Sequence, residues 1–318
     1  MVPPGYALRV NVLEQCQYRC LYCLPGSVSP YTPNKSRLTP PEYARLAPLF
    51  VRAGVRKVRF TGGEPLLRED LPDIVRAFRT ALPVGELAVT TNGEHLPKML
   101  DALVEAGLDR ATVHVDSLRP DRYRTLMGDG DVGAVLEGLL EARTRLREVK
   151  LNVVVQRGGN DDELTDFLDW SLRHGIQVRF IELMNTGSAR DYVQVSFFSG
   201  RDIVARIAER ESVEPLPRAS LADPAALYRT RRGIVFGVIA SDTEPFCASC
   251  NRLRLTPDGK LRGCLYQSGG VALGSALRAG AEDAELERML ALGIRNKRSH
   301  HPSVAAERVP FSMSESGG

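Results

Sequence analysis

Six cysteines stand in two groups of three, and the spacing within each group is typical of metal ligands. They are Cys16, Cys20 and Cys23, followed after a long interval by Cys247, Cys250 and Cys264. Disulfide bonds are not expected, because the first residues carry no export signal and a chain of 318 residues can bury its own core. The two groups therefore predict two metal centres.

Each group supplies three thiolates, one fewer than a structural zinc site requires. The second group also has no adjacent histidine that could complete such a site. Three thiolates leave one coordination position open, which suits an iron–sulfur cluster whose last iron binds another molecule. Zinc with a remote fourth ligand remains the alternative on spacing alone.

Composition narrows the class of protein. The chain has 42 lysines and arginines against 39 aspartates and glutamates, a net charge of +3. That balance gives no reason to expect nucleic acid or a membrane surface as a partner. No apolar run approaches the roughly 20 residues that span a bilayer. We expect a folded cytoplasmic protein with neither kind of partner.

The elements that must position the cysteines alternate through the first part of the chain. Short runs rich in valine, isoleucine and leucine predict strands at residues 6–12, 55–60, 86–91, 110–115, 150–155 and 177–182. Helical patterns between them cover residues 40–54, 70–81, 96–106, 131–147 and 161–174. Thr39 and Glu42 form a capping box at the start of the first helix.

Six strands that alternate with helices predict parallel β/α units with right-handed crossovers. An open doubly wound sheet and a barrel both fit, although six strands are too few for a closed eight-stranded barrel. In either case the site should lie at the carboxyl ends of the strands. Residues that could form such a site do follow these ends: polar residues and glycines at 61–65, 92–93 and 116–117, and Met184.

The alternation weakens after about residue 190. We expect a loop over residues 214–223, a strand over 234–240, and a hairpin formed by 252–255 and 260–263. This change divides the chain into a region 1–212 and a C-terminal region 213–318. We expect Lys297 and the pair His300-His301 to be solvated surface groups rather than metal ligands.

The loop from Cys16 to Cys23 resembles the cluster loop of the radical S-adenosylmethionine enzymes, and Gly62-Gly63-Glu64-Pro65 resembles their methionine-binding turn. The resemblance implies a partial (βα)6 TIM-like barrel and a [4Fe–4S] cluster on the first three cysteines. It also implies S-adenosylmethionine as a cosubstrate, which one electron splits into methionine and a 5′-deoxyadenosyl radical.

A closer resemblance, over nearly the whole chain, is to the GTP 3′,8-cyclase family of molybdenum-cofactor biosynthesis. The segments that carry it are residues 57–66, 90–93, 179–184 and, above all, 245–265. The chain also ends in Gly-Gly, as members of that family do. This resemblance implies a C-terminal segment with a second [4Fe–4S] cluster, at whose open iron the guanine of GTP binds. The implied product is (8S)-3′,8-cyclo-7,8-dihydroguanosine 5′-triphosphate.

The resemblance also assigns site residues. Those implied to contact S-adenosylmethionine are Tyr22, Gly63, Glu64, Met184 and His114, the last in place of the family's serine. Those implied to line the GTP site are Arg9, Lys57, Arg59, Thr90, Lys150, Arg179, Arg252 and Arg254. Arginine forks suit a triphosphate because they bind phosphate oxygens in pairs. The terminal Gly317 and Gly318 are implied to enter the catalytic site late in the reaction.

The implied partners are an electron donor such as flavodoxin or ferredoxin, and a downstream pyranopterin synthase that receives the product. A homodimer is left open. His114, Phe311 and Ser316 depart from the family pattern. These departures leave open an alternative function, that of a related enzyme with two clusters that acts on another nucleotide or a peptide. The rival from another class is a non-catalytic iron–sulfur or zinc-binding sensor.

Overall fold

A twelve-stranded sheet runs through the computed structural model, which describes residues 5–23, 36–184, 190–218, 220, 222–267 and 269–297. Six of its strands are those that the sequence predicts, and they lie parallel and side by side in chain order. Their bounds are β1 Tyr6–Asn11, β2 Val55–Thr61, β3 Glu86–Thr91, β4 Arg110–His114, β5 Glu148–Val155 and β6 Gln177–Glu182. The expected series of parallel strands is confirmed.

Strands from the C-terminal third extend this sheet at both edges. β9 (Val235–Ile239) lies parallel to β6, and β10 (Arg252–Leu255) lies parallel to β1. Antiparallel strands complete the edges: β8 Ala226–Thr230 and β7 Val213–Leu216 beyond β9, and β11 Lys260–Arg262 and β12 Val271–Ala272 beyond β10. The parallel part of the sheet is therefore wider than six strands, and residues before and after position 212 share one sheet.

Two expectations for the C-terminal region have different outcomes. The hairpin at 252–255 and 260–263 is confirmed, because β10 and β11 pair antiparallel. The loop expected over 214–223 is wrong at its start, where β7 pairs with β8. Pro215 is tolerated inside β7 because β7 is an edge strand, on which one N–H can be missing from the ladder.

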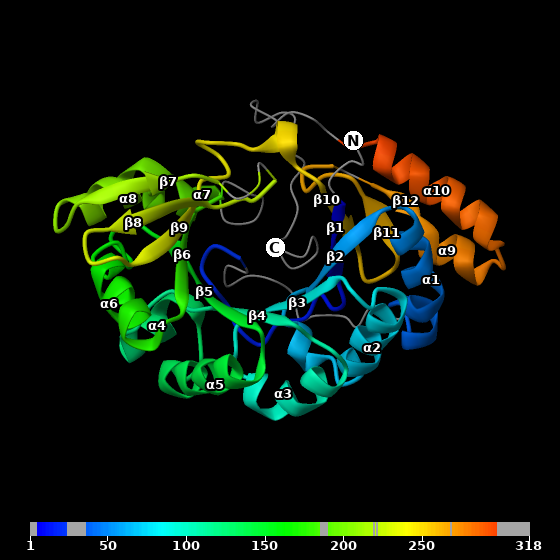
Figure 1. Cartoon of the computed structure of the whole chain (residues 1–318), viewed down its shortest axis with the longest axis horizontal. Helices are drawn as coiled ribbons and strands as arrows, with labels where there is room; N and C mark the ends of the chain where they lie inside the picture. Colours follow the sequence, from blue (N-terminus) through cyan, green and yellow to red (C-terminus); the bar gives the residue numbers. More distant parts are fainter. Residues whose placement is uncertain are drawn as a thin grey trace.

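Helices line the outer, convex side of the curved sheet (Figure 1). Their bounds are α1 Pro40–Arg52, α2 Leu71–Ala81, α3 Leu96–Glu105, α4 Pro120–Met127, α5 Val132–Arg145, α6 Leu164–His174, α7 Arg190–Ser196, α8 Gly200–Ala208, α9 Leu273–Arg278 and α10 Asp283–Arg295. The capping box of α1 forms as expected, since the Thr39 N–H donates to Glu42 Oε2 at 2.7 Å. None of the described helices is long and apolar enough to cross a membrane.

Alternation along the strands gives the sheet an apolar outer face and a polar inner face. On β1, Leu8 and Val10 are fully buried in the core, and Arg9 between them points to the opposite side. The outer face packs on the helices; the rings of Phe60 (β2) and Phe78 (α2), for example, meet edge to face at 5.6 Å. The inner face is therefore free to carry a site.

Candidate active site

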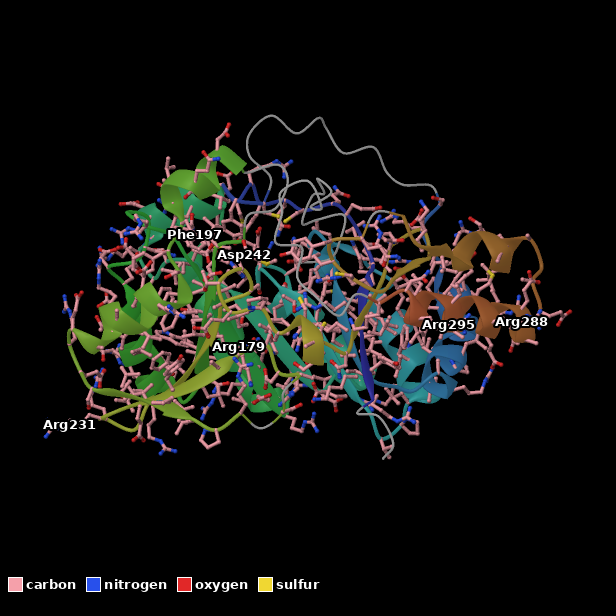
Figure 2. All side chains as sticks on the ribbon, turned by 90° about the horizontal axis from the view of Figure 1, so that it is seen from above. Arg179, Phe197, Arg231, Asp242, Arg288 and Arg295 are labelled. Carbon is pink, nitrogen blue, oxygen red and sulfur yellow. The ribbon has the colours of Figure 1, made fainter. Side chains whose placement is uncertain are left out.

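Five arginines gather on the inner face of the sheet. They are Arg9 on β1, Arg59 on β2, Arg179 on β6, and Arg252 and Arg254 on β10. Strand register sets three of them in a row, because Arg9 stands opposite Arg59 on one side and Arg254 on the other. Figure 2 shows Arg179 in the middle of the molecule, whereas Arg231, Arg288 and Arg295 lie at its periphery.

Burial and, after it, the charges of neighbouring arginines lower the pKa values of three of these side chains. Burial lowers the pKa of Arg9 well below its usual value, and the charges of Arg254 and Arg252 lower it further. Burial, followed by the charge of Arg179, lowers the pKa of Arg59 to about 10. Burial, followed by the charge of Arg252, also lowers the pKa of Arg254 to about 10. A polyanion bound among them would relieve both effects, so this face is built for an anionic ligand.

Neutral side chains orient two of these arginines. Arg59 Nη1 donates to the hydroxyls of Thr90 and Thr112, each at 3.1 Å. Arg179 donates to Asn152 Oδ1 at 3.0 Å and to the Thr112 hydroxyl at 3.2 Å. Thr112 and Asn152 are not among the predicted site residues, although strand alternation places them on the same face as Arg110 and Lys150. Because these acceptors carry no charge, they hold the guanidinium groups without neutralising them.

The two predicted lysines differ in their relation to this group, since the charge of Arg179 lowers the pKa of Lys150 after burial does. The Lys57 side chain is 61% exposed, and its Nζ lies 3.9 Å from Glu86. Lys150 Nζ lies 3.3 Å from Glu148, and burial is the main cause that lowers its pKa. Arg110 forms ion pairs with both of these glutamates. The structure thus brings the predicted arginines together and leaves Lys57 at the margin.

The first three cysteines lie on the loop after β1. The Cys23 N–H donates to the Cys20 carbonyl at 2.9 Å, and Asn92 Nδ2 lies 3.9 Å from Cys16 Sγ. Burial raises the pKa of the Cys16 thiol to about 12, with the negative charges of Glu64 and Cys23 as further causes. Burial also raises the pKa of Cys20, and both other cysteines of the group add to it. The three thiols are therefore close enough to affect one another's charge, and bound cations would favour their thiolates.

The second three cysteines surround the start of β10. Cys247 begins a short 3-10 turn, Cys247–Ser249, and the Cys250 N–H donates to the Cys247 carbonyl at 3.2 Å. Burial raises the pKa of Cys247, and the negative charges of Cys250 and Cys264 raise it further. Burial would also raise the pKa of Cys250, but the Arg252 N–H and the Lys297 ammonium lower it overall.

Each group offers three free thiols, the donor set that an iron–sulfur cluster with one open position takes. Within the described ranges, no three histidine, cysteine, aspartate or glutamate side chains converge on one metal position. In an iron–sulfur cluster each thiolate binds its own iron, so the sulfur atoms stand around the cluster instead of converging. A zinc ion would need a fourth ligand besides the three thiols of a group.

The two cysteine groups lie at opposite ends of two neighbouring strands. Cys16 follows the carboxyl end of β1, and Cys250 precedes the amino end of the parallel neighbour β10. Arg9 and Arg254, which are aligned across these two strands, therefore lie between the groups. A ligand held by the arginines could contact both metal centres at once.

The turn after β2 packs directly against the first cysteine loop. Gly63 N donates to the Leu13 carbonyl at 2.6 Å, and a Cβ on Gly63 would stand 2.2 Å from the Gln15 carbonyl oxygen. Only glycine allows this approach. Glu64, which is 1% exposed, accepts from the Leu66 N–H, the Thr91 hydroxyl and the Asn92 N–H at 2.7–3.0 Å. A contact with a cosubstrate's amino group would have to use the remaining lone pair of Glu64 Oε2.

A buried carboxylate joins two of the predicted cosubstrate residues. Tyr22 Oη lies 2.7 Å from His114 Nε2, and the same nitrogen lies 2.8 Å from Asp116 Oδ1. Asp116 is fully buried, and its Oδ1 accepts from the Val154 N–H at 2.7 Å. Within the described part of the chain, Asp116 Oδ2 has no hydrogen-bond partner. The sequence marked Asp116 only as a polar residue after a strand, without a role in the site.

The remaining predicted residues have different outcomes. Met184 follows β6 and is half-buried. Gly317 and Gly318 lie outside the described residues, as do Phe311, Ser316 and the histidine pair at 300–301. The expectation for Lys297 is wrong: it is half-buried, and its Nζ donates to Cys250 Sγ at 3.4 Å. Lys297 follows α10, and the packing of α10 beside β11 brings it to Cys250, a contact that the local sequence does not predict.

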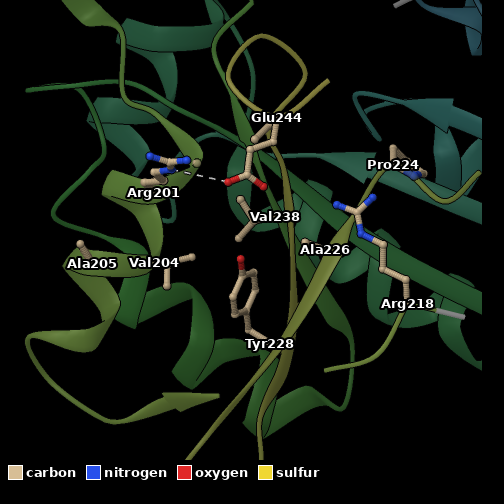
Figure 3. Close-up of a pocket in the computed structure, with 11 residues that line it drawn as sticks. Arg201, Val204, Ala205, Arg218, Pro224, Ala226, Tyr228, Val238 and Glu244 are labelled. Atoms are coloured by element: carbon tan, nitrogen blue, oxygen red, sulfur yellow. Dashed lines mark ion pairs between the residues drawn. The ribbon is translucent and has the colours of Figure 1, made fainter. Parts of the chain in front are cut away.

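A separate cavity of about 270 Å³ lies on the other face of the sheet (Figure 3). Val204 of α8, Tyr228 of β8 and Val238 of β9 line it, and an ion pair between Arg201 and Glu244 lies at 3.7 Å. A Cβ on Gly237, the neighbour of Val238, would instead face Arg179 at 3.1 Å. Because adjacent strand residues point to opposite faces, the cavity is not part of the arginine site.

Comparison with known proteins agrees with this geometry. The chain matches the family model of the radical SAM superfamily over residues 10–171, and that of Molybdenum Cofactor Synthesis C over residues 176–303. It is 38% identical over 314 residues to a GTP 3′,8-cyclase of Moorella thermoacetica, covering 98% of this chain and 97% of the relative. It is 39% identical to GTP 3′,8-cyclase 1 of Mycobacterium tuberculosis, covering 91% of this chain and 82% of the relative.

A solved structure has a similar fold. The crystal structure of Streptococcus suis SuiB bound to S-adenosylmethionine aligns with a TM-score of 0.64, over 88% of this chain and 66% of that chain. The sequence identity is 12%, so the likeness concerns the fold alone.

Proposed function

The chain belongs to the GTP 3′,8-cyclase family of the radical S-adenosylmethionine superfamily, and from this we propose that it cyclises GTP between C3′ and C8. The product, (8S)-3′,8-cyclo-7,8-dihydroguanosine 5′-triphosphate, enters molybdenum-cofactor biosynthesis. The observation that carries the proposal is the group of five inner-face arginines between two cysteine groups. The sheet is curved (Figure 1), and this curvature supports the expected partial barrel.

The arginines suit the triphosphate end of GTP. A planar guanidinium binds two phosphate oxygens at once, and three aligned guanidiniums match a chain of phosphates. Thr112 and Asn152 fix the planes of Arg59 and Arg179 in advance, so less side-chain freedom is lost on binding. The purine end would then extend along β10 toward the second cysteine group.

The cysteines are proposed to hold two [4Fe–4S] clusters. Cys16, Cys20 and Cys23 would ligate the first, and the remaining three would ligate the second. When bound, the first cluster supplies the electron that cleaves S-adenosylmethionine, and the second offers an open iron to the guanine. The chain's own part is to bring the ribose to the right place beside the cosubstrate and to exclude water from the radical.

The residues beside the first group are proposed to hold S-adenosylmethionine. Gly63 keeps its backbone close to the cysteine loop, and Glu64 ties that turn to the loop after β3. Asp116 Oδ1 fixes the ring of His114. Its Oδ2, which has no partner among the described residues, can accept a hydrogen bond from a hydroxyl of the cosubstrate. Tyr22 and Met184 complete the proposed set.

Replacing Asp116 with asparagine tests this arrangement. The substitution keeps the size of the side chain but removes the charge and turns one acceptor into a donor. We expect S-adenosylmethionine to bind about tenfold more weakly, since hydrogen bonds to a charged group are among the stronger ones. GTP affinity should stay within a factor of two of the unaltered protein, a rough bound given by the separation of the two sites. Equal weakening of both ligands, measured by calorimetry on cluster-loaded protein, would reject the assignment.

The terminal Gly317 and Gly318 are proposed to enter the site and to steer ring closure. Their lack of side chains would let the backbone approach the substrate closely. Removing both should preserve the clusters and GTP affinity, while formation of cyclised nucleotide falls about tenfold through lost positioning. Product should be measured by chromatography at equal iron content. An unchanged rate of cyclisation would show that the tail has no part in the reaction.

Substrate dependence tests the proposed function as a whole. The reduced, reconstituted protein should form 5′-deoxyadenosine faster with GTP than with ATP or with no nucleotide. ATP carries the same triphosphate, so the comparison tests the purine separately from the arginines. Equal stimulation by ATP would favour the rival enzyme with another nucleotide substrate, and no cleavage in any condition would favour a sensor. The electron donor, the downstream synthase and the cytoplasmic location stay predictions.

A further inference from the structure

The side chain of Lys297 reaches into the second cysteine group. Its Nζ lies 3.4 Å from Cys250 Sγ, 2.8 Å from the Arg252 carbonyl and 3.1 Å from the Gly263 carbonyl. An ammonium group has three hydrogens, and these three acceptors use all of them. One lysine thus joins a cysteine of the group, the strand that carries the arginines and the residue before Cys264.

The backbone around Lys297 is built for this approach. A Cβ on Gly263 would stand 2.8 Å from Lys297 Cα and 3.2 Å from the Gly293 carbonyl oxygen. A Cβ on Gly293 would in turn stand 2.6 Å from Leu261 Cδ2. Glycine at both positions lets the end of α10 lie directly against β11. The lysine, which follows α10 by two residues, is therefore held beside Cys250 by the packing of that helix.

From these contacts we infer that Lys297 is a positioning residue of the second cluster, which sets its reduction potential through a charge-assisted hydrogen bond to the Cys250 sulfur. The inference rests on the proposed function, because it requires a cluster on Cys247, Cys250 and Cys264. Hydrogen bonds to ligand sulfurs and local charge are two of the main determinants of cluster potential.

The sign of the effect follows from electrostatics. Reduction adds one negative charge to the cluster, and a cation that donates to a ligand sulfur stabilises the reduced form more than the oxidised form. Lys297 therefore raises the potential. A lysine that served only to tie the Arg252 and Gly263 carbonyls together would hold the backbone but would leave the potential unchanged.

The test isolates the second cluster in the full chain. In a variant with Cys16, Cys20 and Cys23 replaced by alanine, only the second group can bind iron. Lys297→Met is then compared with that background, with Lys297→Arg as the charged replacement. Lys98→Met serves as the control, because Lys98 is exposed on α3, a helix on the outer side of the sheet (Figure 1). The midpoint potential is read from the paramagnetic signal during an anaerobic redox titration without GTP.

We expect Lys297→Met to shift the one-electron equilibrium at least tenfold toward the oxidised cluster, a fall of about 59 mV. Lys297→Arg should recover much of that fall, and Lys98→Met should leave the potential unchanged. An intact cluster with an unchanged potential in Lys297→Met would overturn the inference.

Cluster loss gives an equally clear result. If Lys297→Met loses the cluster, its retention in Lys297→Arg supports the charged hydrogen bond, and its loss from both variants overturns the inference. A background variant that binds no iron at all would overturn the second cluster itself, and the inference with it. The failure of the proposed function is thus distinguishable from the failure of the role of Lys297.

Discussion

Replacing Cys16, Cys20 and Cys23 together with alanine should abolish cleavage of S-adenosylmethionine and leave about half of the iron in the protein. The expected loss is complete, because one missing group of thiolates removes the site at which the cosubstrate is reduced. The remaining iron should stay with the second group, at the opposite end of the neighbouring strands β1 and β10. Iron analysis and detection of 5′-deoxyadenosine measure the two outcomes.

The matched control replaces Cys247, Cys250 and Cys264 instead. That variant should also keep about half of the iron, and it should still cleave S-adenosylmethionine slowly without forming cyclised nucleotide. Persistent cleavage in the first variant would contradict the assignment of the first cluster. Loss of all iron in both variants would show that the two groups form one site.

Replacing Arg254 with methionine should have two effects of opposite sign. GTP affinity should fall roughly tenfold to a hundredfold, the consequence of losing a charge-assisted contact with phosphate. The ligand-free protein should become more stable, because methionine keeps an apolar stem while it removes a charge that burial and the neighbouring charge of Arg252 both disfavour. Calorimetric titration with GTP and thermal unfolding without it measure these effects.

The sign of the stability effect is the same over the usual pH range. The pKa of Arg254 is lowered to about 10 in the folded protein, so its charge opposes folding at any pH below that value. Arg288, exposed on α10, provides the control, and Arg288→Met should change neither GTP affinity nor stability. A variant of Arg254 that is less stable and also binds S-adenosylmethionine poorly would indicate damage to the fold instead.

The parallel strands could be predicted from the sequence. So could the face of the sheet on which each candidate residue lies, because side chains alternate along a strand. Arg9 stands between Leu8 and Val10, which are both buried in the core, so its side chain has to point to the opposite face, as it does in the structure. The series of β/α units was readable because each strand is short, apolar and bounded by turns. The two metal centres could be predicted because the spacing of the cysteines within each group is a local feature of the sequence.

Long-range packing explains what the sequence did not predict. β9 and β10 join β6 and β1 in parallel, although each comes from far along the chain. The pairing of strands that are so far apart in the chain leaves no pattern in the local sequence from which it could be predicted. Lys297 reads as a solvated residue near a chain end, and only the close contact of α10 with Gly263 brings it to Cys250. Asp116 follows a strand like many polar residues, and its role depends on His114 and Tyr22.

GTP labelled with deuterium at C3′ provides the most direct measurement of the central claim. The reduced protein is incubated without oxygen with this GTP and S-adenosylmethionine, and both products are analysed by mass spectrometry after chromatography. We predict that 5′-deoxyadenosine gains one deuterium, and that a new nucleotide with the composition of GTP, less the deuterium and with one hydrogen in its place, elutes separately. Unlabelled 5′-deoxyadenosine together with unchanged GTP would contradict the account.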